Sequence, residues 1–189
     1  MKAFFPGGYG TDAQRLATAL GIADQGSARA LASYGLEPES AFLVTWLPAV
    51  QVAWLGGLTQ AEERRLKELV RARHSNLPDH AERLLDGWLL RKPHDALFRI
   101  GRRVLHFQLT ALSPAERPAL IARVGGPCVD LAHVSGGVLG VGAVSADERA
   151  CLRTLAAELS VYSPQAADGA RDRSTISTGP VVTTVGRQG

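Results

Sequence analysis

Cysteine is scarce in this sequence, where Cys128 and Cys151 are the only two among 189 residues. They lack a Cys-x-x-Cys spacing, and two thiols are too few for the disulfide framework on which small secreted domains depend. After Met1 and Lys2, the segment AFFPGGYG is too short and too rich in glycine for the apolar region of a signal peptide. We therefore interpret both cysteines as core thiols and expect a cytoplasmic location.

The sequence also lacks a long hydrophobic run. Its most apolar stretch, residues 127–144, is interrupted by Asp130, His133 and four glycines. A helix that spans a membrane needs about 20 mostly apolar residues. No transmembrane segment is predicted.

An excess of charge of one sign is missing as well. The chain has 21 basic and 18 acidic residues and a formal net charge of +3. Such a balance creates no large field of one sign, so charge alone does not predict a nucleic-acid partner.

Alternating apolar and polar residues, the pattern of a half-buried strand, are nearly absent, and only VVTTV at 181–185 could form one. Apolar residues recur instead at helical spacing, and 46% hydrophobic residues suffice for a packed core. The sequence therefore predicts an all-α fold, a single bundle of about seven to nine helices. Residues 38–160 form its main domain, residues 1–37 form short helices packed on it, and residues 161–189 form a poorly structured tail or docking segment.

Proline and glycine give the local predictions. Pro48 lies inside a helical pattern over residues 38–55 and predicts a kink or two abutting segments near Leu47. Gly87 interrupts the apolar face of a helix over residues 79–91 and indicates close packing against a neighbour. Residues 113–135 are predicted as two short helices, because Pro118 and Gly125 limit the first of them.

The same helix start occurs twice, 86 positions apart. Thr59 with Glu62, and Ser145 with Glu148, have the spacing of a capping box, in which hydroxyl and carboxylate satisfy the free amides at a helix start. Each box contributes about 1 kcal/mol. A structural role is the favoured interpretation of both glutamates.

Three ordered segments resemble the TerB-like family of helical proteins associated with tellurite resistance. They are TWLPAVQVAWLGGLTQAEERRL at 45–66, LLDGWLLRKPHDALF at 84–98 and VSGGVLGVGAVSADERACL at 134–152, and the resemblance covers residues 40–159. It implies an all-helical cytoplasmic domain of a stress or defence system that acts by binding rather than by catalysis. The family usually has Ala-Asp-Gly at the first turn, where this chain has Gly56 in place of the aspartate.

A metal-binding protein or a metal-dependent enzyme that uses acidic residues at helix starts is an alternative hypothesis. The resemblance leaves Glu62, Asp147 and Glu148 as family-type acids, and Asp130 with His133 has the i, i+3 spacing that could share a metal ion. The Glu-x-x-His signature of carboxylate-bridged di-iron bundles is absent from the sequence. We expect no cofactor, and we interpret the Asp130 and His133 pair as a polar pair at a packing boundary.

A basic segment supplies a second alternative, the binding of an acidic partner, a lipid headgroup or nucleic acid. It lacks the interleaved aromatic residues that stack on bases, so a solvated helix face is favoured. Its basic residues are Arg91, Lys92, Arg99, Arg102 and Arg103.

Motifs of catalysis are missing too, since neither Gly-x-Ser-x-Gly nor a phosphate-binding loop is present. The leading prediction is a non-enzymatic interaction module that binds a protein partner.

Overall fold

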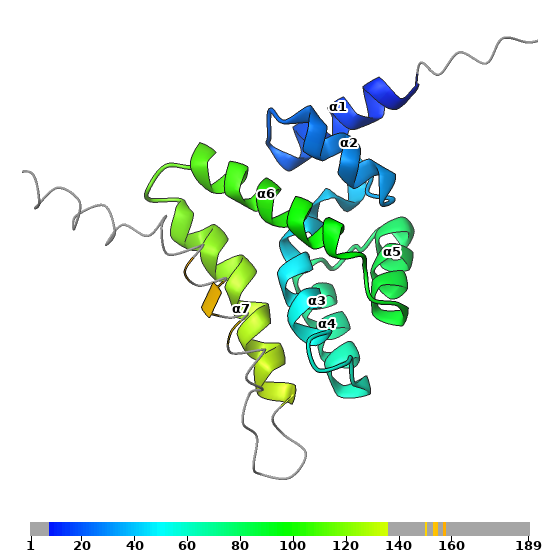
Figure 1. Ribbon diagram of the computed structural model, residues 1–189, viewed down its shortest axis with the longest axis vertical. Coiled ribbons are helices and arrows are strands. Elements are labelled where there is room, and N and C mark those ends of the chain that lie inside the picture. Colours follow the sequence, from blue (N-terminus) through cyan, green and yellow to red (C-terminus); the bar gives the residue numbers. More distant parts are fainter. Residues whose placement is uncertain (1–7, 136–149, 151–152, 155–156, 158–189) are drawn as a thin grey trace, which may run out of the picture.

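The computed structural model describes residues 8–135, 150, 153, 154 and 157 (Figure 1). Within them the chain is helical and contains no strand, so the all-α prediction is confirmed. The elements in chain order are α1 (Gly8–Leu20), α2 (Gln25–Ser33), the 3₁₀ helix η1 (Pro38–Trp46), α3 (Leu47–Ala53), α4 (Gln60–Arg73), α5 (Asp79–Leu90), α6 (Asp95–Ala111) and α7 (Arg117–Ser135).

One hydrophobic core joins all of these elements. η1 lies at its centre and contacts α1, α3, α5, α6 and α7, while α7 also packs along α3 and α4. Every helix contributes fully buried side chains, which is the arrangement of a single bundle. They include Leu16, Leu31, Leu43, Trp46, Leu47, Leu66, Leu85, Leu97, Leu109 and Leu131.

The break at Pro48 confirms the predicted pair of abutting segments, because η1 ends at Trp46 and α3 begins at Leu47. Pro48 has no N–H to donate to the carbonyl of Val44, and the N–H of Leu47 donates to that carbonyl instead. This tighter i to i−3 bond is the 3₁₀ pattern. The segment before the break is therefore a 3₁₀ helix rather than the expected α-helix.

Residues 113–135 differ from the prediction of two helices, since α7 runs unbroken through Pro127. The capping box predicted at Ser113 forms only in part: its N–H and Oγ donate to Glu116 Oε2 over 3.0 and 2.7 Å, but these residues form a turn and α7 begins at Arg117. Pro118 lies in the first turn of α7, where no intrahelical donor is needed. The free energy gained by burying an apolar stripe of α7 outweighs the cost of the backbone hydrogen bond that Pro127 removes. The stripe consists of Leu120, Val124, Cys128 and Leu131.

The glycine that permits a close helix contact is Gly101, not Gly87. A Cβ atom at Gly101 would lie 2.6 Å from Leu47 Cδ1, so α6 approaches the start of α3 as closely as a glycine allows. At Gly87 an added Cβ would have no heavy atom within 4 Å. The prediction for Gly87 was wrong because helical periodicity shows which face of a helix is apolar but not how closely the next helix approaches it.

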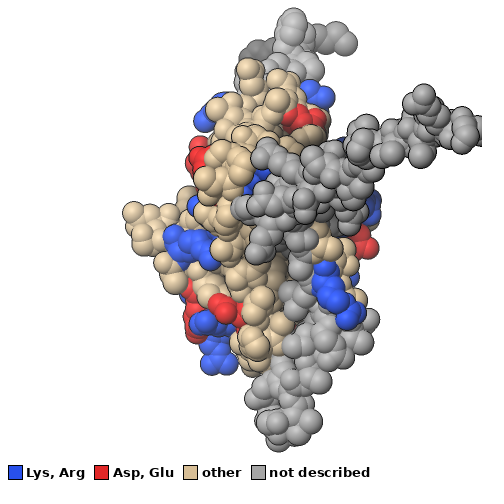
Figure 2. All heavy atoms as spheres, turned by 90° about the vertical axis from the view of Figure 1, so that its left-hand side faces the viewer, with Lys and Arg blue, Asp and Glu red and all other residues tan. Residues whose placement is uncertain are grey.

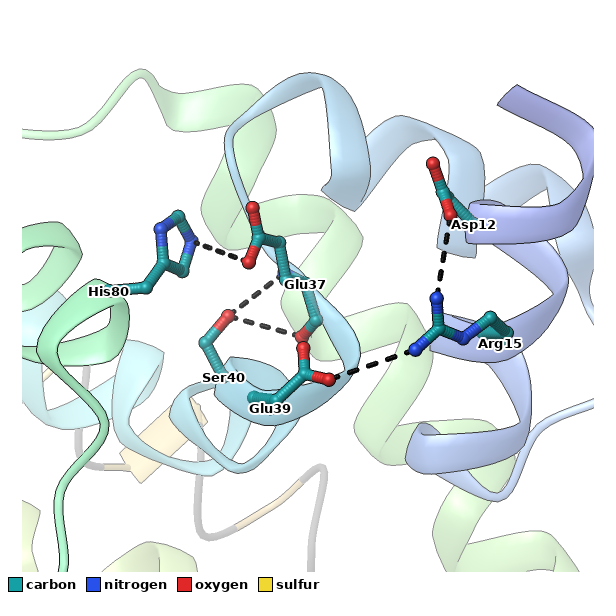
Figure 3. A network of polar contacts seen from close by, with 6 residues as sticks. All are labelled: Asp12, Arg15, Glu37, Glu39, Ser40 and His80. Carbon is teal, nitrogen blue, oxygen red and sulfur yellow. Dashed lines mark hydrogen bonds and ion pairs between the residues drawn. The ribbon is translucent and has the colours of Figure 1, made fainter. Parts of the chain in front are cut away.

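Polar contacts hold η1 between α1 and α5 (Figure 3). His80 Nε2 of α5 lies 2.8 Å from the carbonyl oxygen of Gly35 and 3.8 Å from a carboxylate oxygen of Glu37. On the other side, Arg15 of α1 lies 3.8 Å from the carboxylate of Glu39. η1 is thereby fixed at both flanks. None of the helices in the described residues combines the length and the apolar character needed to cross a membrane.

Candidate binding groove

The first predicted acidic residue, Glu62, is committed to the start of α4. Its side chain is buried, with 2% exposure. Glu62 Oε2 accepts the N–H of Thr59 over 2.8 Å and the Thr59 hydroxyl over 2.7 Å, and the N–H of Glu62 donates to Thr59 Oγ1 over 3.2 Å. The capping box predicted at Thr59 is therefore present. Its predicted twin at Ser145 and Glu148 lies outside the described residues.

The structure does not bring the other predicted metal ligands together. Asp130 Oδ2 of α7 lies 3.7 Å from Arg65 Nη2 of α4, so its carboxylate forms an ion pair across the helix interface. His133 is exposed in the last turn of α7. In residues 8–135, no group of three or more His, Cys, Asp or Glu side chains could hold a metal ion. Asp147 falls outside the described part of the chain.

The basic segment divides between a loop and a helix. Arg91 and Lys92 lie in the loop that precedes α6, where Lys92 Nζ is 3.9 Å from Asp95. Arg102 donates to Gln51 Oε1 over 3.0 Å, whereas Arg99 and Arg103 are exposed one turn apart on α6. On the molecular face in Figure 2, basic side chains alternate with acidic ones and form no continuous patch.

A groove that sequence patterns did not indicate lies where α1, η1, α4, α6 and α7 meet. Its volume is about 1070 Å³, at the upper end of the range of about 300–1,000 Å³ for small-molecule pockets. Alanine, leucine, proline and phenylalanine side chains form most of its wall. The polar residues that line it include Arg73, His74, Gln108, Glu116 and Arg123. We call this site the α6–α7 groove.

Aromatic rings and a guanidinium fix one wall of the α6–α7 groove. The rings of Phe42 and His74 lie 4.1 Å apart between centroids. The guanidinium carbon of Arg73 lies 4.7 Å from the centroid of the buried Trp46 ring, a cation–π contact. Arg73 Nη1 also donates to the carbonyl oxygen of Arg123 over 2.8 Å, which joins the end of α4 to α7. This wall is rigid because each group is held by another.

The charges of the groove are only partly compensated. Hydrogen bonds from the hydroxyl and N–H of Ser113 lower the pKa of Glu116. The carboxylate is therefore ionised at neutral pH, and one of its oxygens already accepts both of these hydrogen bonds. Burial, followed by the charges of Arg73 and Arg123, lowers the pKa of His74, so its ring is neutral there. The Arg123 side chain is exposed and forms no hydrogen bond or ion pair with any described residue. Within the described residues, the groove therefore presents the guanidinium of Arg123 without an ion-pair partner beside apolar walls.

Two polar atoms in this region are buried without hydrogen-bond partners among the described residues, Trp46 Nε1 and Gln108 Oε1. The other end of the Gln108 amide is occupied, because Nε2 donates to the carbonyl oxygen of Leu20 over 2.7 Å. A buried polar atom without a partner costs about 1–3 kcal/mol, and native structures contain few of them. Both lie on the side of the core that carries the groove.

A second, smaller hollow lies between α4 and α5 and has a volume of about 720 Å³. We call it the α4–α5 hollow. Lys67 Nζ stands 2.9 Å from both Glu63 Oε1 and Asp86 Oδ1, and these hydrogen bonds, that from Glu63 first, raise the pKa of Lys67. Trp54 Nε1 donates to the carbonyl oxygen of Trp88 over 2.9 Å. Lys67, Glu63 and Asp86 are thus paired with one another, while Arg83, which also lines the hollow, is exposed.

No protein-family model, no curated protein and no solved structure matches this chain. The TerB-like resemblance therefore stays a prediction. Of its three segments, the first forms the junction of η1 with α3, the glycine turn and α4, and the second forms the junction of α5 with α6. The third falls mostly outside the described residues.

Sequence reasoning missed the α6–α7 groove because its lining comes from helices far apart in the chain. Arg73 and Arg123 are 50 positions apart, and no motif links them. The one local signal was the sequence RARH at 71–74, where a histidine follows the basic residues at the end of α4.

Proposed function

We propose that this chain is a non-enzymatic binding domain whose α6–α7 groove receives a protein partner. The observation that carries the proposal is the guanidinium of Arg123, which lines an apolar groove and has no hydrogen bond or ion pair in the part of the chain that the structure describes. Apolar walls supply area that gains from leaving water, and a few fixed polar groups set the orientation of what binds. The TerB-like resemblance supports a place in a stress, tellurite-resistance or defence assembly.

The wall of the groove is suited to a binding role because it is held in place before a partner arrives. Arg73 is fixed by the Trp46 ring below it and by the Arg123 carbonyl beside it. A surface that is already ordered avoids part of the entropy cost that side chains pay on binding. Rigid walls favour recognition of one shape over adaptation to many.

Two alanines of α7 give a matched test of the groove. Ala119 lines the groove and Ala122 does not, while both are exposed on the same helix. Ala119→Trp should fill the groove and abolish capture of the partner when the tag-free protein is incubated with an extract of its native host. Ala122→Trp should capture the same partner as the original chain. Equal capture by both variants, with equal thermal stability, would contradict the proposal.

The tail at residues 161–189 is a second proposed contact, because its glycine-, serine- and threonine-rich sequence predicts a poorly structured docking segment. Deletion after Ser160 should leave thermal unfolding unchanged and weaken capture in the same assay. Unchanged capture would remove the tail from the proposal and leave the groove as its sole contact.

A further inference from the structure

We infer that the partner of the α6–α7 groove is an apolar peptide segment that carries a carboxylate, and that this carboxylate pairs with Arg123. The inference rests on the proposed function and names the chemistry of the ligand. Its basis is the position of one free guanidinium beside apolar walls, together with the fixed charges around it.

The charge of the groove selects a single anionic group. Arg73 and Arg123 contribute two positive charges, and the carboxylate of Glu116 contributes one negative charge. Because the pKa of His74 is lowered, its ring adds no charge at neutral pH. The net charge of the lining is then positive by one unit, which complements one carboxylate.

Arg123 is the residue placed to meet that carboxylate. Arg73 already faces the Trp46 ring and donates to the Arg123 carbonyl, whereas the side chain of Arg123 forms no hydrogen bond or ion pair in residues 8–135. The bond from Arg73 holds the backbone of Arg123 in position. A guanidinium presents parallel N–H donors that match a carboxylate in a bidentate pair.

A nucleic acid fits this groove less well than a peptide. Its backbone carries one negative charge per phosphate, and successive phosphates would meet the ionised Glu116. The rings of Phe42 and His74 already stack on one another, so they offer no free pair for a base. A volume of about 1070 Å³ has room for several side chains of a peptide.

Selection from a library of random short peptides tests the inference without a known partner. Immobilised original protein selects binders, and peptides that also bind Ala119→Trp are discarded. We expect the remaining peptides to combine apolar residues with Asp or Glu. Neutral or basic peptides, or no enrichment over Ala119→Trp, would overturn the inference.

A double-mutant cycle then locates the charge pair. Each selected peptide is paired with a twin in which Asp or Glu is replaced by its amide. The affinities of both peptides are measured for three proteins, the original, Arg123→Gln and Arg99→Gln. Neutralising the peptide should weaken binding to the original protein and to Arg99→Gln about tenfold, equivalent to about 1.4 kcal/mol. Against Arg123→Gln the twins should bind within about twofold of each other. An equal loss with all three proteins would overturn the assignment to Arg123.

Competition with a single-stranded oligonucleotide separates the two macromolecular classes. At physiological salt the oligonucleotide should not displace a selected peptide, and displacement at comparable concentration would overturn the inference. The proposed function fails separately, when Ala119→Trp keeps full capture of the native partner. If Ala119→Trp abolishes that capture but the charge cycle shows no coupling, only the carboxylate inference fails.

Discussion

The α6–α7 groove and the α4–α5 hollow are both depressions between helices of one bundle, but the charged residues that line the hollow balance, whereas those that line the groove leave one positive charge in excess. In the hollow, Lys67 stands 2.9 Å from two carboxylates, those of Glu63 and Asp86. In the groove, Arg73 donates to the backbone carbonyl of Arg123, and the Arg123 side chain has no hydrogen bond or ion pair within the described residues. Charges that neutralise one another hold a fold together, whereas charges left over beside apolar walls are available to a ligand.

Buried polar atoms follow the same division. On the side of the hollow, the indole N–H of Trp54 reaches the carbonyl oxygen of Trp88 over 2.9 Å. On the side of the groove, Trp46 Nε1 and Gln108 Oε1 are buried without partners among the described residues. A sequence under selection for stability alone would gain by satisfying these atoms. Gln108 lines the groove, and Trp46 lies beneath Arg73 in its wall.

The largest expected effect comes from reversing the charge of the groove. Arg123→Glu should weaken binding of a carboxylate-bearing peptide about 30-fold, equivalent to about 2 kcal/mol, because attraction becomes repulsion. The free energy of unfolding should change by less than about 0.5 kcal/mol, because Arg123 is exposed and unpaired in the described residues. Titration calorimetry and urea unfolding measure the two quantities. Unchanged affinity would place the recognised charge elsewhere.

Charge reversal at the hollow should do the opposite. Lys67→Glu places three carboxylates together and should lower the free energy of unfolding by about 1 kcal/mol, while affinity at the groove stays unchanged. Lys67→Met is the control, because it removes the ion pairs and leaves two carboxylates together instead of three, so it should cost less. Added salt should restore more of the stability of Lys67→Glu than of Lys67→Met. A loss of groove binding in Lys67→Glu would break the distinction between the two sites.

The sequence predicts a feature of the fold well where local hydrogen bonding determines it, and poorly where packing between distant helices does. Capping at Thr59 and the break at Pro48 follow from local hydrogen bonding, and both formed where the residues indicated, whereas the bonds between Ser113 and Glu116 close a turn ahead of α7. The continuity of α7 through Pro127 did not follow, because burial of its apolar stripe depends on helices distant in sequence. Local rules failed where tertiary contacts outweigh them.

The candidate site was less accessible to sequence reasoning than the fold. Basic residues were read as one segment over residues 91–103, but Lys92 and Arg102 are occupied by Asp95 and Gln51. Arg123, which lines the groove and has no side-chain hydrogen bond or ion pair in the described residues, stands on α7, at a position that no spacing marks. A groove assembled from several helices has no period in the sequence, so its residues become visible only when the helices are packed.

A larger side chain in the α4–α5 hollow should impair neither stability nor binding, in contrast to Ala119→Trp in the α6–α7 groove. Gly87 lines the hollow, and an added Cβ would meet no heavy atom within 4 Å. Gly87→Ala should therefore raise the free energy of unfolding by about 0.5–1 kcal/mol through helix propensity, with no change in binding. The same exchange at Gly101 is the counterpart, because its Cβ would lie 2.6 Å from Leu47 Cδ1. Thermal unfolding should show a rise for Gly87→Ala and none for Gly101→Ala.

The smallest expected effect is a pH dependence that only the groove should show. The folded protein lowers the pKa of His74, through burial and then through Arg73 and Arg123, whereas the unfolded chain has a histidine pKa of about 6.5. Below about pH 6.5 the unfolded state therefore binds more protons, so the contribution of His74 to stability is full above that pH and declines below it. Urea unfolding of the original chain and of His74→Gln between about pH 5 and 8 should show their difference shrinking as the pH falls.

Binding should respond to the same proton with the opposite sign. Protonated His74 adds a third positive charge to the groove, so a carboxylate-bearing peptide should bind more tightly as the pH falls through the folded pKa, provided that its own acid stays ionised. The hollow offers no such response, because the pKa of Lys67 is raised from a value already above this range. A stability that falls while affinity rises, with both changes absent in His74→Gln, would tie the proton to the groove. If the free energy of unfolding and the peptide affinity instead both fell or both rose with pH, the titrating group would lie outside the groove.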